Sequence, residues 1–315
     1  MKLTAKLFET FQKQAFPLKE YLSKNTLAPD SVDILRLDQL HETVSGNKWF
    51  KLKYNIDMAI KEGYSEEVYS EEGHSGILTC GGVHSNHLHA IACAGQYFNI
   101  PVRAFVRGYS NLPLTPTLVD CEKMGMQIEF IDKKTYLKRY DPIWCQQQAQ
   151  QSNSYWIPEG GNNDLGQKGC EDIVNGCLDN GSFNYDEVWL SIGSGCTFQG
   201  IERALPDTTI LKGIMAIKGG QELGESLVAN ARIPSRCEID YESHWGGFGK
   251  CPQDLIEFIQ QHDRWGLPLD PIYTSKLMFS FEKEWAEGRL DPDKKYLIVH
   301  SGGLQGRRGI KGLSI

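Results

Sequence analysis

Two lysines three residues apart, Lys48 and Lys51, are the residues of this sequence best placed to do chemistry. A lysine becomes a free amine, able to condense with an aldehyde, when its surroundings disfavour the ammonium form. A second lysine that stays charged can grip a phosphate. Because residues three apart on a helix lie on neighbouring faces, the pair could hold one cofactor, covalently through one lysine and by its phosphate through the other. The alternative is that both are ordinary solvated residues of a helix.

A glycine-rich segment at 193–200 has the make-up of an anion-binding loop. Backbone N–H groups without side-chain obstruction, together with the positive end of a following helix, can bind a phosphate. The segment is not a nucleotide P-loop, because Ile201 and Glu202 stand where lysine and serine or threonine are required. Taken alone, a structural glycine turn explains it equally well.

Ser85 and Asn86 follow the double glycine Gly81-Gly82 at a predicted strand-to-helix turn. Ser85 could move a proton or act as a nucleophile, and Asn86 could contact a cofactor. The alternative is a helix cap, because serine and asparagine are preferred capping residues. Tyr273 follows Pro271, which fixes the backbone before a turn; a catalytic tyrosine and an ordinary half-buried one both fit.

The histidines His84, His87 and His89 match no zinc-binding spacing, and no cluster of cysteines or carboxylates lies beside them in the sequence. We therefore expect no metal site. Histidines that are hydrogen-bonded in the loop or stacked on an aromatic ring are the expectation.

The elements that must position these residues alternate between strand and helix along the chain. Glycine-rich segments directly follow several predicted strands, and the carboxyl ends of parallel strands collect ligands. Alternation of this kind predicts parallel, helix-covered sheets of an α/β protein. The predicted strands are Ser31–Leu40, Gly76–Cys80, Val102–Val106, Gln127–Ile131, Ser154–Pro158, Glu187–Ile192, Leu211–Ile217, a strand near Glu238, and Tyr296–His300. The predicted helices are Leu3–Phe16, Lys51 to Gly63, Leu88–Tyr97, Leu114–Lys123, the glutamine-rich run before Gln151, Leu165–Leu178, Leu223–Ala229, Pro252–Gln261, and one after Lys276.

Composition limits the classes of function. The chain has 315 residues, enough for two domains or one large α/β unit, and 40% of them are hydrophobic. Its net charge of −7 provides no basic surface for nucleic acid or an anionic membrane. The apolar runs are too short to span a bilayer, and residues 1–20 lack the apolar core of a signal peptide, so a cytoplasmic location is expected. Nine cysteines without a C-x-x-C pair favour reduced thiols.

Five segments taken together resemble the 1-aminocyclopropane-1-carboxylate deaminase and D-cysteine desulfhydrase family. Each is similar to a family motif, and their order along the chain is the same. They are Ser45-Gly46-Asn47-Lys48-x-x-Lys51-Leu52 (G-G-N-K-x-R-K-L), Gly81 to His87 (G-G-x-Q/H-S-N-x), Ser194-Gly195-Cys196-Thr197 (T-G-S-T), Asp270 to Lys276 (D-P-x-Y-x-G-K, except at Ser275) and His300 to Gly303 (H-x-G-G). The matches span residues 36 to 306, and although no single one is specific, the set is.

The resemblance implies a pyridoxal 5'-phosphate enzyme with the tryptophan synthase β-like fold (fold type II), usually a homodimer. It also implies two domains, a smaller one at 51–157 and a larger cofactor-binding one made from 1–50 and 158–315. The family's Schiff-base lysine corresponds to Lys48 and its phosphate-gripping lysine to Lys51.

The remaining site residues are carried over in the same way. The resemblance implies that Ser85 is the catalytic serine, Asn86 the ring-contacting asparagine and Tyr273 the active-site tyrosine. The phosphate loop corresponds to Gly195, Cys196 and Thr197. We further expect Thr274 to be the hydrogen-bonding partner of the pyridine nitrogen.

Departures from the family motifs bear on the substrate. Trp49-Phe50 replaces smaller or basic residues, and Phe248 stands where family members have a tyrosine. The ring-opening deaminases have glutamate and leucine where this chain has Thr274 and Ser301, whereas the desulfhydrases have threonine at both positions. We therefore expect release of ammonia and a 2-oxo acid from a small amino acid, with β-elimination of D-cysteine favoured. The alternatives are ring opening of 1-aminocyclopropane-1-carboxylate, another enzyme of the same fold type, and a non-catalytic cofactor-binding homologue.

Overall fold

A computed structural model describes residues 18–20, 32–40, 44, 46–63, 75–178 and 181–313. These residues form two compact units, each with its own sheet. Of the described residues, unit 1 contains 48–63 and 75–169, and unit 2 contains the rest. The predicted helix Leu3–Phe16 lies outside the described residues.

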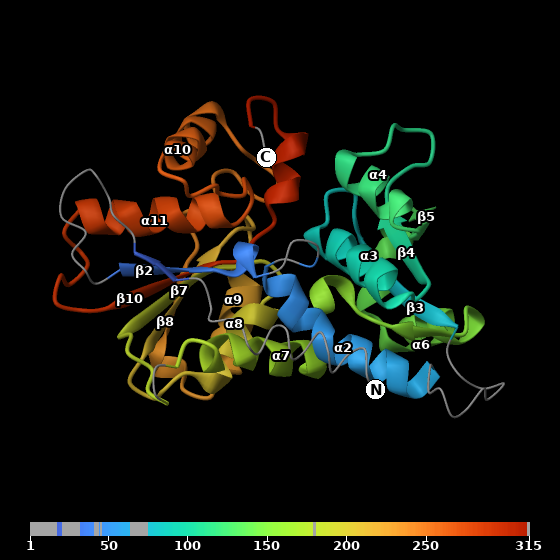
Figure 1. Ribbon diagram of the computed structural model, residues 1–315, viewed down its shortest axis with the longest axis horizontal. Helices are drawn as coiled ribbons and strands as arrows, with labels where there is room; N and C mark the ends of the chain where they lie inside the picture. The colour runs from blue at the N-terminus through green and yellow to red at the C-terminus, as the bar shows by residue number, and fades with distance from the viewer. Residues whose placement is uncertain are drawn as a thin grey trace. The chain divides into compact units, whose positions relative to one another are not determined.

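Unit 1 is built on a four-stranded, all-parallel sheet in the order β5-β4-β3-β6. Its two central strands are buried along most of their length, apart from two exposed arginines in the second, as expected for strands covered on both faces. In Figure 1, α3 lies beside β3 and β4. The elements are α2 (Asn47–Gly63, which begins at the last residue before unit 1), β3 (Gly76–Gly82), α3 (Asn86–Phe98), β4 (Val102–Arg107), α4 (Pro116–Lys123), β5 (Gln127–Ile131), α5 (Lys133–Leu137), η2 (Lys138–Tyr140), α6 (Pro142–Gln151), β6 (Ser154–Trp156) and η3 (Glu159–Gly161). Helix α7 (Asp164–Asn175) contains residues of both units.

Unit 2 is built on a six-stranded sheet in the order β1-β2-β10-β7-β8-β9, parallel except for β1. Figure 1 shows α10 and α11 on one side of this sheet and α8 and α9 on the other. Its elements are β1 (Leu18–Glu20), β2 (Val32–Arg36), η1 (Leu37–Gln39), β7 (Glu187–Ile192), α8 (Cys196–Ala204), β8 (Ile210–Met215), α9 (Gln221–Ala229), η4 (Pro234–Arg236), β9 (Cys237–Asp240), α10 (Gln253–Arg264), α11 (Thr274–Ala286), β10 (Tyr296–His300) and η5 (Leu304–Gly309).

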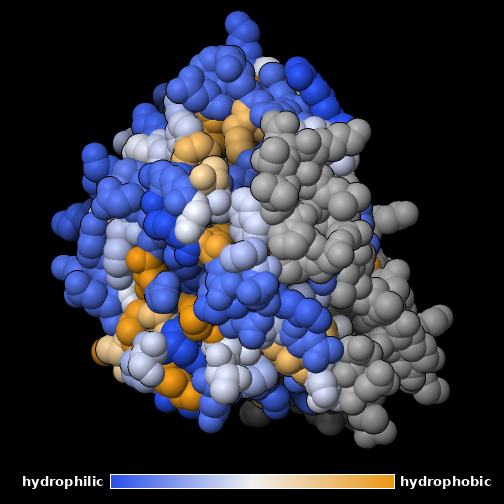
Figure 2. Space-filling model, turned by 90° about the vertical axis from the view of Figure 1, so that its left-hand side faces the viewer, coloured by the Kyte–Doolittle hydropathy of each residue, from blue (hydrophilic) through white to orange (hydrophobic). Residues whose placement is uncertain are grey.

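The core of unit 2 lies between the sheet and the α10–α11 layer. Trp189 on β7, Phe281 on α11 and Tyr296 on β10 are buried together, and the ring centroids of Trp189 and Phe281 are 5.1 Å apart. The surface differs from this apolar core. In Figure 2, which faces the side on which α11 lies in Figure 1, hydrophilic residues predominate among the described ones, and hydrophobic residues form small separate groups. Burial of large aromatic side chains thus fixes α11 on the sheet.

The predicted alternation of strand and helix is confirmed, and three strands have the predicted ends: β5, β7 and β10. Helix α2 starts at Asn47, four residues before its predicted apolar stripe, and ends at Gly63 as predicted. Helix α11 starts at Thr274, so Lys276 lies inside it rather than before it. The short α5 was not predicted, because five residues are too few to show a helical period.

No helix among the described residues is long and apolar enough to cross a membrane.

Candidate active site

The lysine helix α2 is anchored at its first residues by backbone contacts within unit 2. The N–H of Gly46 donates to the carbonyl of Leu37 (2.9 Å), and the N–H of Asn47 donates to the carbonyl of Ser301 (3.0 Å). Gly46 has φ +76°, and a Cβ there would come within 2.3 Å of the Ser301 oxygen. Only glycine fits this approach. The ends of β2 and β10 therefore fix the residues that immediately precede Lys48.

The side chain of Asn47 links the start of α2 to the predicted phosphate loop. Its Nδ2 donates to Oγ1 of Thr197 at 2.9 Å, and both residues are buried. Lys48 is the next residue in the chain, so the covalent structure connects the predicted cofactor-binding lysine to this loop. The asparagine of the G-N-K motif was recognised in the sequence but was assigned no role there.

The predicted phosphate loop has the backbone that anion binding requires. Gly195 precedes α8 with φ +84° and provides no side-chain cap to it. A Cβ on Gly195 would meet Leu227 at 2.6 Å, so this position also requires glycine. Cys196 and Thr197 form the first turn of α8 and are buried. The N-terminal N–H groups and the dipole of α8 make this turn suitable for a phosphate.

Lys48 and Lys51 lie on the first turns of α2, Lys48 half-buried and Lys51 buried. The glycine-rich segment 159–163 holds this part of the helix. A Cβ on Gly161 would approach Cβ of Lys51 to 3.0 Å. The amides of Asn55 and Asn163 bond each other reciprocally at 3.1 and 2.7 Å, and Nδ2 of Asn55 also donates to the Lys51 carbonyl. These contacts explain the glycine at 161 and the amide at 163.

Ser85 and Asn86 occupy the turn that was predicted for them. Ser85 is the N-cap of α3, and its Oγ accepts from the N–H of Leu88 at 3.3 Å. A Cβ on Gly81 would lie 3.0 Å from that Oγ, so the glycine gives the serine room. Asn86 is buried at the first position of α3. The capping interpretation of Ser85 is correct, and the catalytic role stays a prediction.

His87 is a neutral, fully buried imidazole whose proton position can be deduced. Oγ1 of Thr79 donates its only hydrogen to the carbonyl of Ile157 (2.7 Å). It must therefore accept from Nε2–H of His87, at 2.8 Å. Nδ1 of His87 is then a bare acceptor, buried and without a hydrogen-bond partner among the described residues. Burial lowers the pKa of His87 to about 3, and the charges of Lys48 and Lys51 add to the effect.

Tyr273 and Thr274, at the start of α11, are positioned by Asp270. Oδ1 of this buried carboxylate accepts from the N–H groups of Tyr273 (2.9 Å) and Thr274 (2.7 Å). The Thr274 hydroxyl accepts from the Asp270 N–H at 2.7 Å and lies 3.1 Å from Oδ1, to which it can donate. Burial raises the pKa of Asp270, although these hydrogen bonds oppose the rise. The hydroxyl of Thr274 retains one lone pair for a ligand.

The ring of Tyr273 lies at the beginning of the predicted phosphate loop. A Cβ on Gly193 would meet the tyrosine ring at 2.9 Å and its hydroxyl at 3.0 Å. The ring of Phe248 is 6.1 Å from that of Tyr273 in an edge-on arrangement, and Phe248 is 52% exposed. Unit 2 thus brings Tyr273 together with the loop that contains Gly195, Cys196 and Thr197.

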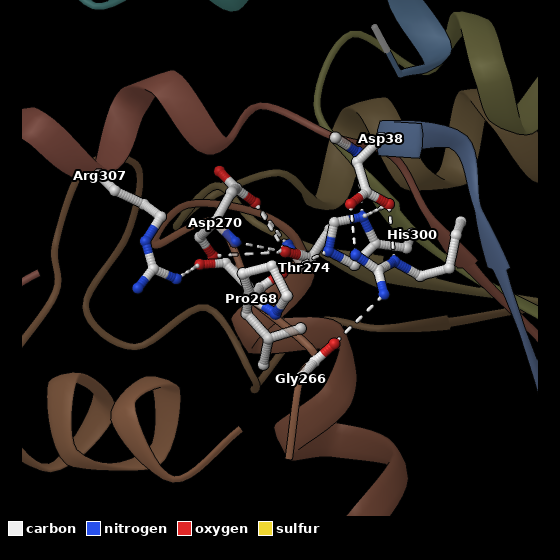
Figure 3. Close-up of polar contacts among 10 residues, drawn as sticks. Asp38, Gly266, Pro268, Asp270, Thr274, His300 and Arg307 are labelled. Atoms are coloured by element: carbon white, nitrogen blue, oxygen red, sulfur yellow. Dashed lines mark hydrogen bonds and ion pairs between the residues drawn. The ribbon is translucent and has the colours of Figure 1, made fainter. Parts of the chain in front are cut away.

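Three side chains from distant parts of unit 2 hold the segment 266–270, which leads into Asp270 (Figure 3). Each donates to a backbone carbonyl of that segment. Arg36 donates to Gly266 (3.5 Å), His300 Nε2 to Pro268 (2.8 Å) and Arg307 to Leu269 (2.8 Å). These contacts fix the approach of the chain to Tyr273 and Thr274.

Asp38 joins two of these side chains in one buried cluster. Its carboxylate accepts from Nε and Nη2 of Arg36 at 2.8 and 2.6 Å, and its Oδ1 lies 3.0 Å from Nδ1 of His300. Burial alone would raise the pKa of Asp38, but the hydrogen bonds from Arg36 and His300 outweigh it and hold that pKa well below its usual range. Sequence reasoning recognised His300 in a motif but missed Arg36 and Asp38, which carry no local signal.

Among the described residues, no group of three or more histidine, cysteine, aspartate or glutamate side chains could hold a metal ion. His84 is exposed, His87 is bonded to Thr79, and His89 Nε2 lies 3.4 Å from Asp120.

Comparison with known proteins confirms the resemblance predicted from the motifs. No protein-family model matches the chain. A Pyrococcus horikoshii protein called "Putative 1-aminocyclopropane-1-carboxylate deaminase" is 25% identical over 282 residues, covering 84% of this chain and 81% of that one. The D-cysteine desulfhydrase of Klebsiella pneumoniae is 22% identical over 295 residues, which is 86% of each chain.

Solved structures confirm the predicted fold class. The crystal structure of a homologue of 1-aminocyclopropane-1-carboxylate deaminase matches with a TM-score of 0.76 at 23% identity, covering 96% of this chain and 95% of that one. The fold is therefore tryptophan synthase β-like, the type II fold of pyridoxal-phosphate enzymes, with two parallel helix-covered sheets.

Proposed function

We propose that this chain is a pyridoxal-phosphate-dependent enzyme that releases ammonia and a 2-oxo acid from a small amino acid, with β-elimination of D-cysteine as the favoured reaction. The observation that carries the proposal is the hydrogen bond from Asn47 to Thr197. It connects the residue before Lys48 to an uncapped, glycine-rich helix start. The relatives that are named after D-cysteine and 1-aminocyclopropane-1-carboxylate support it.

The residues present suit the cofactor. Lys48 would bind its aldehyde covalently, and Lys51 would pair with its phosphate beside the first turn of α8, at Gly195, Cys196 and Thr197. Asn86 and Thr274 would contact the ring. The orphaned Nδ1 of His87, buried near the charges of Lys48 and Lys51, is a further polar atom that a filled site could satisfy.

The bound cofactor would supply the electron sink that stabilises negative charge at the α-carbon of an amino acid. Oγ of Ser85 or Nζ of Lys48 takes the α-proton in the proposed reaction. Loss of the thiol group releases hydrogen sulfide, and hydrolysis of the remaining enamine gives pyruvate and ammonia. Because the Thr274 hydroxyl already donates to Asp270, it can offer a ring N–H only a lone pair. A neutral acceptor stabilises a protonated ring less than a carboxylate does, which suits β-elimination.

Ring-opening deamination of 1-aminocyclopropane-1-carboxylate to 2-oxobutanoate is the second candidate, because the Pyrococcus relative bears that name. In that reaction Ser85 and Tyr273 would share proton removal and attack. The absence of a hydroxyl on Phe248, beside Tyr273, argues against it. A homodimer, the division into domains 51–157 and 1–50 with 158–315, and a lyase or hydrolase class complete the proposal.

The test replaces Lys48 by alanine and measures visible absorbance after titration with pyridoxal phosphate, together with keto-acid release from D-cysteine and from the cyclopropane substrate. The variant should lose the absorbance of a lysine-linked cofactor and at least about 10³-fold in activity, the scale of losing a covalent catalyst. Lys61→Ala, an exposed lysine of the same helix, is the matched control. Retained absorbance in Lys48→Ala would place the cofactor link elsewhere, and no keto acid from any amino acid would favour a non-catalytic homologue.

A further inference from the structure

Lys276 on α11 is a fully buried lysine to which the proposed reaction gives no role. Its exposed fraction is 0%, although lysine is among the residues least often buried. Its Nζ donates to the carbonyl of Gly247 at 2.9 Å and to that of Ala216 at 3.2 Å. The ammonium therefore joins α11 to the end of β8 and to the glycine-rich loop 245–249.

The environment of this ammonium is unfavourable for a charge. Both hydrogen-bond partners are neutral carbonyls, and burial lowers the pKa of Lys276 to about 8, with Asp270 and Cys251 only partly opposing the shift. An apolar side chain of similar length would fill the same space without losing the hydration of a charge. What distinguishes lysine here is that it holds two backbone oxygens.

The N–H groups of Gly246, Gly247 and Lys250 make local hydrogen bonds in the loop that Lys276 holds, but most of its backbone lies in the left-handed region. Trp245, Gly246, Gly247 and Gly249 have φ values of +52°, +87°, +116° and +74°. Glycines lose more conformational freedom on ordering than other residues do. Two contacts with α11 add to the local hydrogen bonds and tie this loop to the helix: the Trp245 ring, 4.6 Å from that of Phe279, and Nζ of Lys276 on Gly247.

Phe248 directly follows the carbonyl that Lys276 holds. Its ring stands edge-on to Tyr273, and half of it is exposed. Tyr273 itself immediately precedes α11, three residues before Lys276. One helix thus positions both rings, Tyr273 through the backbone and Phe248 through the lysine.

We propose that Lys276 is a positioning residue that fixes the loop 245–249, so that Phe248 forms an apolar wall over Tyr273 that selects amino acids by their β-substituent. The proposal rests on the proposed function. The phenylalanine ring offers no hydrogen bond to replace the water that a hydroxyl substituent would lose. A thiol binds water less strongly than a hydroxyl and so loses less hydration free energy beside this ring. The wall therefore favours D-cysteine over D-serine.

The first arm of the test does not depend on activity. Hydrogen exchange of the amides in 244–250 is compared between the wild type and Lys276→Met. Losing hydrogen bonds from a charged donor should speed this exchange by at least about tenfold, while β8 and α10 keep their rates. Lys283→Met, an exposed lysine of the same helix, is the matched control. Unchanged exchange in the loop would overturn the proposal. If Lys276→Met does not fold, Lys276→Leu, which likewise removes the N–H donors, is judged by the same criterion.

The second arm is a double-mutant cycle of Lys276→Met and Phe248→Ala, read as the ratio of kcat/KM for D-cysteine to that for D-serine. Each single change should lower the ratio by about fivefold, and the double variant should lower it no further, because both act through one wall. Independent, multiplying effects, or an equal loss for both substrates, would overturn the specificity role. If no amino acid is turned over, the proposed function fails, while the exchange arm still decides whether Lys276 holds the loop.

Discussion

The two units differ in the polar interactions that support their site residues. In unit 1, His87 and the lysine helix are supported by neutral contacts: the His87–Thr79–Ile157 chain and the paired amides of Asn55 and Asn163. In unit 2, the neutral bond between Asn47 and Thr197 is joined by buried charged groups: the Arg36–Asp38 ion pair, which His300 contacts, and Lys276. A neutral imidazole resists protonation and a paired carboxylate retains its charge. The difference therefore teaches that pH should act on the two units in separate ranges.

The largest expected effect is acid destabilisation of unit 1 through His87. In the unfolded chain His87 binds a proton near pH 6.5, whereas in the folded chain it binds one only when pH falls to about 3. Stability is therefore lost as pH falls from 6.5 towards 3, by about 5 kcal/mol at 1.36 kcal/mol per pH unit. Protection factors from hydrogen exchange should fall in β3 and β4 at a higher pH than in β7 and β10.

Two variants sharpen this prediction. His87→Phe should remove most of this pH dependence, whereas His84→Phe, at an exposed histidine of the same turn, should leave it in place. Loss of protection in β7 and β10 before β3 and β4 would contradict the comparison.

The next effect is the removal of the carboxylate from the charged cluster. Asp38→Ala leaves Arg36 buried without its counter-ion and removes the carboxylate that His300 contacts, which should cost about 4 kcal/mol of the free energy of unfolding. Urea titration followed by exchange in β10 measures it. Because the folded pKa of Asp38 is depressed, its contribution is present above the unfolded value near 3.9 and is lost only as pH falls through the folded value.

Asp132→Ala provides the contrast in unit 1. Asp132 caps α5 at the surface, where its carboxylate accepts from two backbone N–H groups. Its replacement should have a much smaller effect than that of Asp38. Equal effects would show that the buried cluster does not stabilise unit 2.

A third effect is alkaline and belongs to Lys276. The folded chain releases the Lys276 proton near pH 8, but the unfolded chain keeps it to about 10.5. The wild type should therefore gain about 3 kcal/mol relative to Lys276→Met as pH rises from 8 to 10.5. The quantity to measure is the difference in the free energy of unfolding between the two proteins, in which other titrating groups cancel. A difference that does not vary with pH would be inconsistent with a buried ammonium.

The smallest effect tests the neutral chain of unit 1. Thr79→Val keeps the volume but leaves the Ile157 carbonyl and Nε2–H of His87 without partners, which should cost about 2 kcal/mol. Thr79→Ser keeps the hydroxyl and loses only a methyl group, so it should be less destabilising. If Thr79→Ser had a lower free energy of unfolding than Thr79→Val, the stabilisation would not come from the hydroxyl.

How much could be predicted from the sequence depends on the range of the interactions. Both ends of strands β7 and β10 were predicted correctly, because mainly apolar runs bounded by turn residues are a local signal. The turn at Ser85 was predicted for the same reason. The stretch with the two lysines was predicted to open a helix, but the exact first residue of α2 was not, because it is fixed by the carbonyl of Ser301, far away in the chain.

The sequence by itself determined the order of strands and helices, the glycine turns after the strands and the residue types able to bind a cofactor, since all of these follow from neighbours along the chain. Only the tertiary structure decided that Asn47 bonds Thr197, that Asp38 joins Arg36 to His300, and that Lys276 holds Gly247. A polar group that is buried on folding loses its hydrogen bonds to water and must replace them. Its new partner is whichever group the fold places beside it, wherever that group lies in the chain. No pattern along the chain encodes that choice.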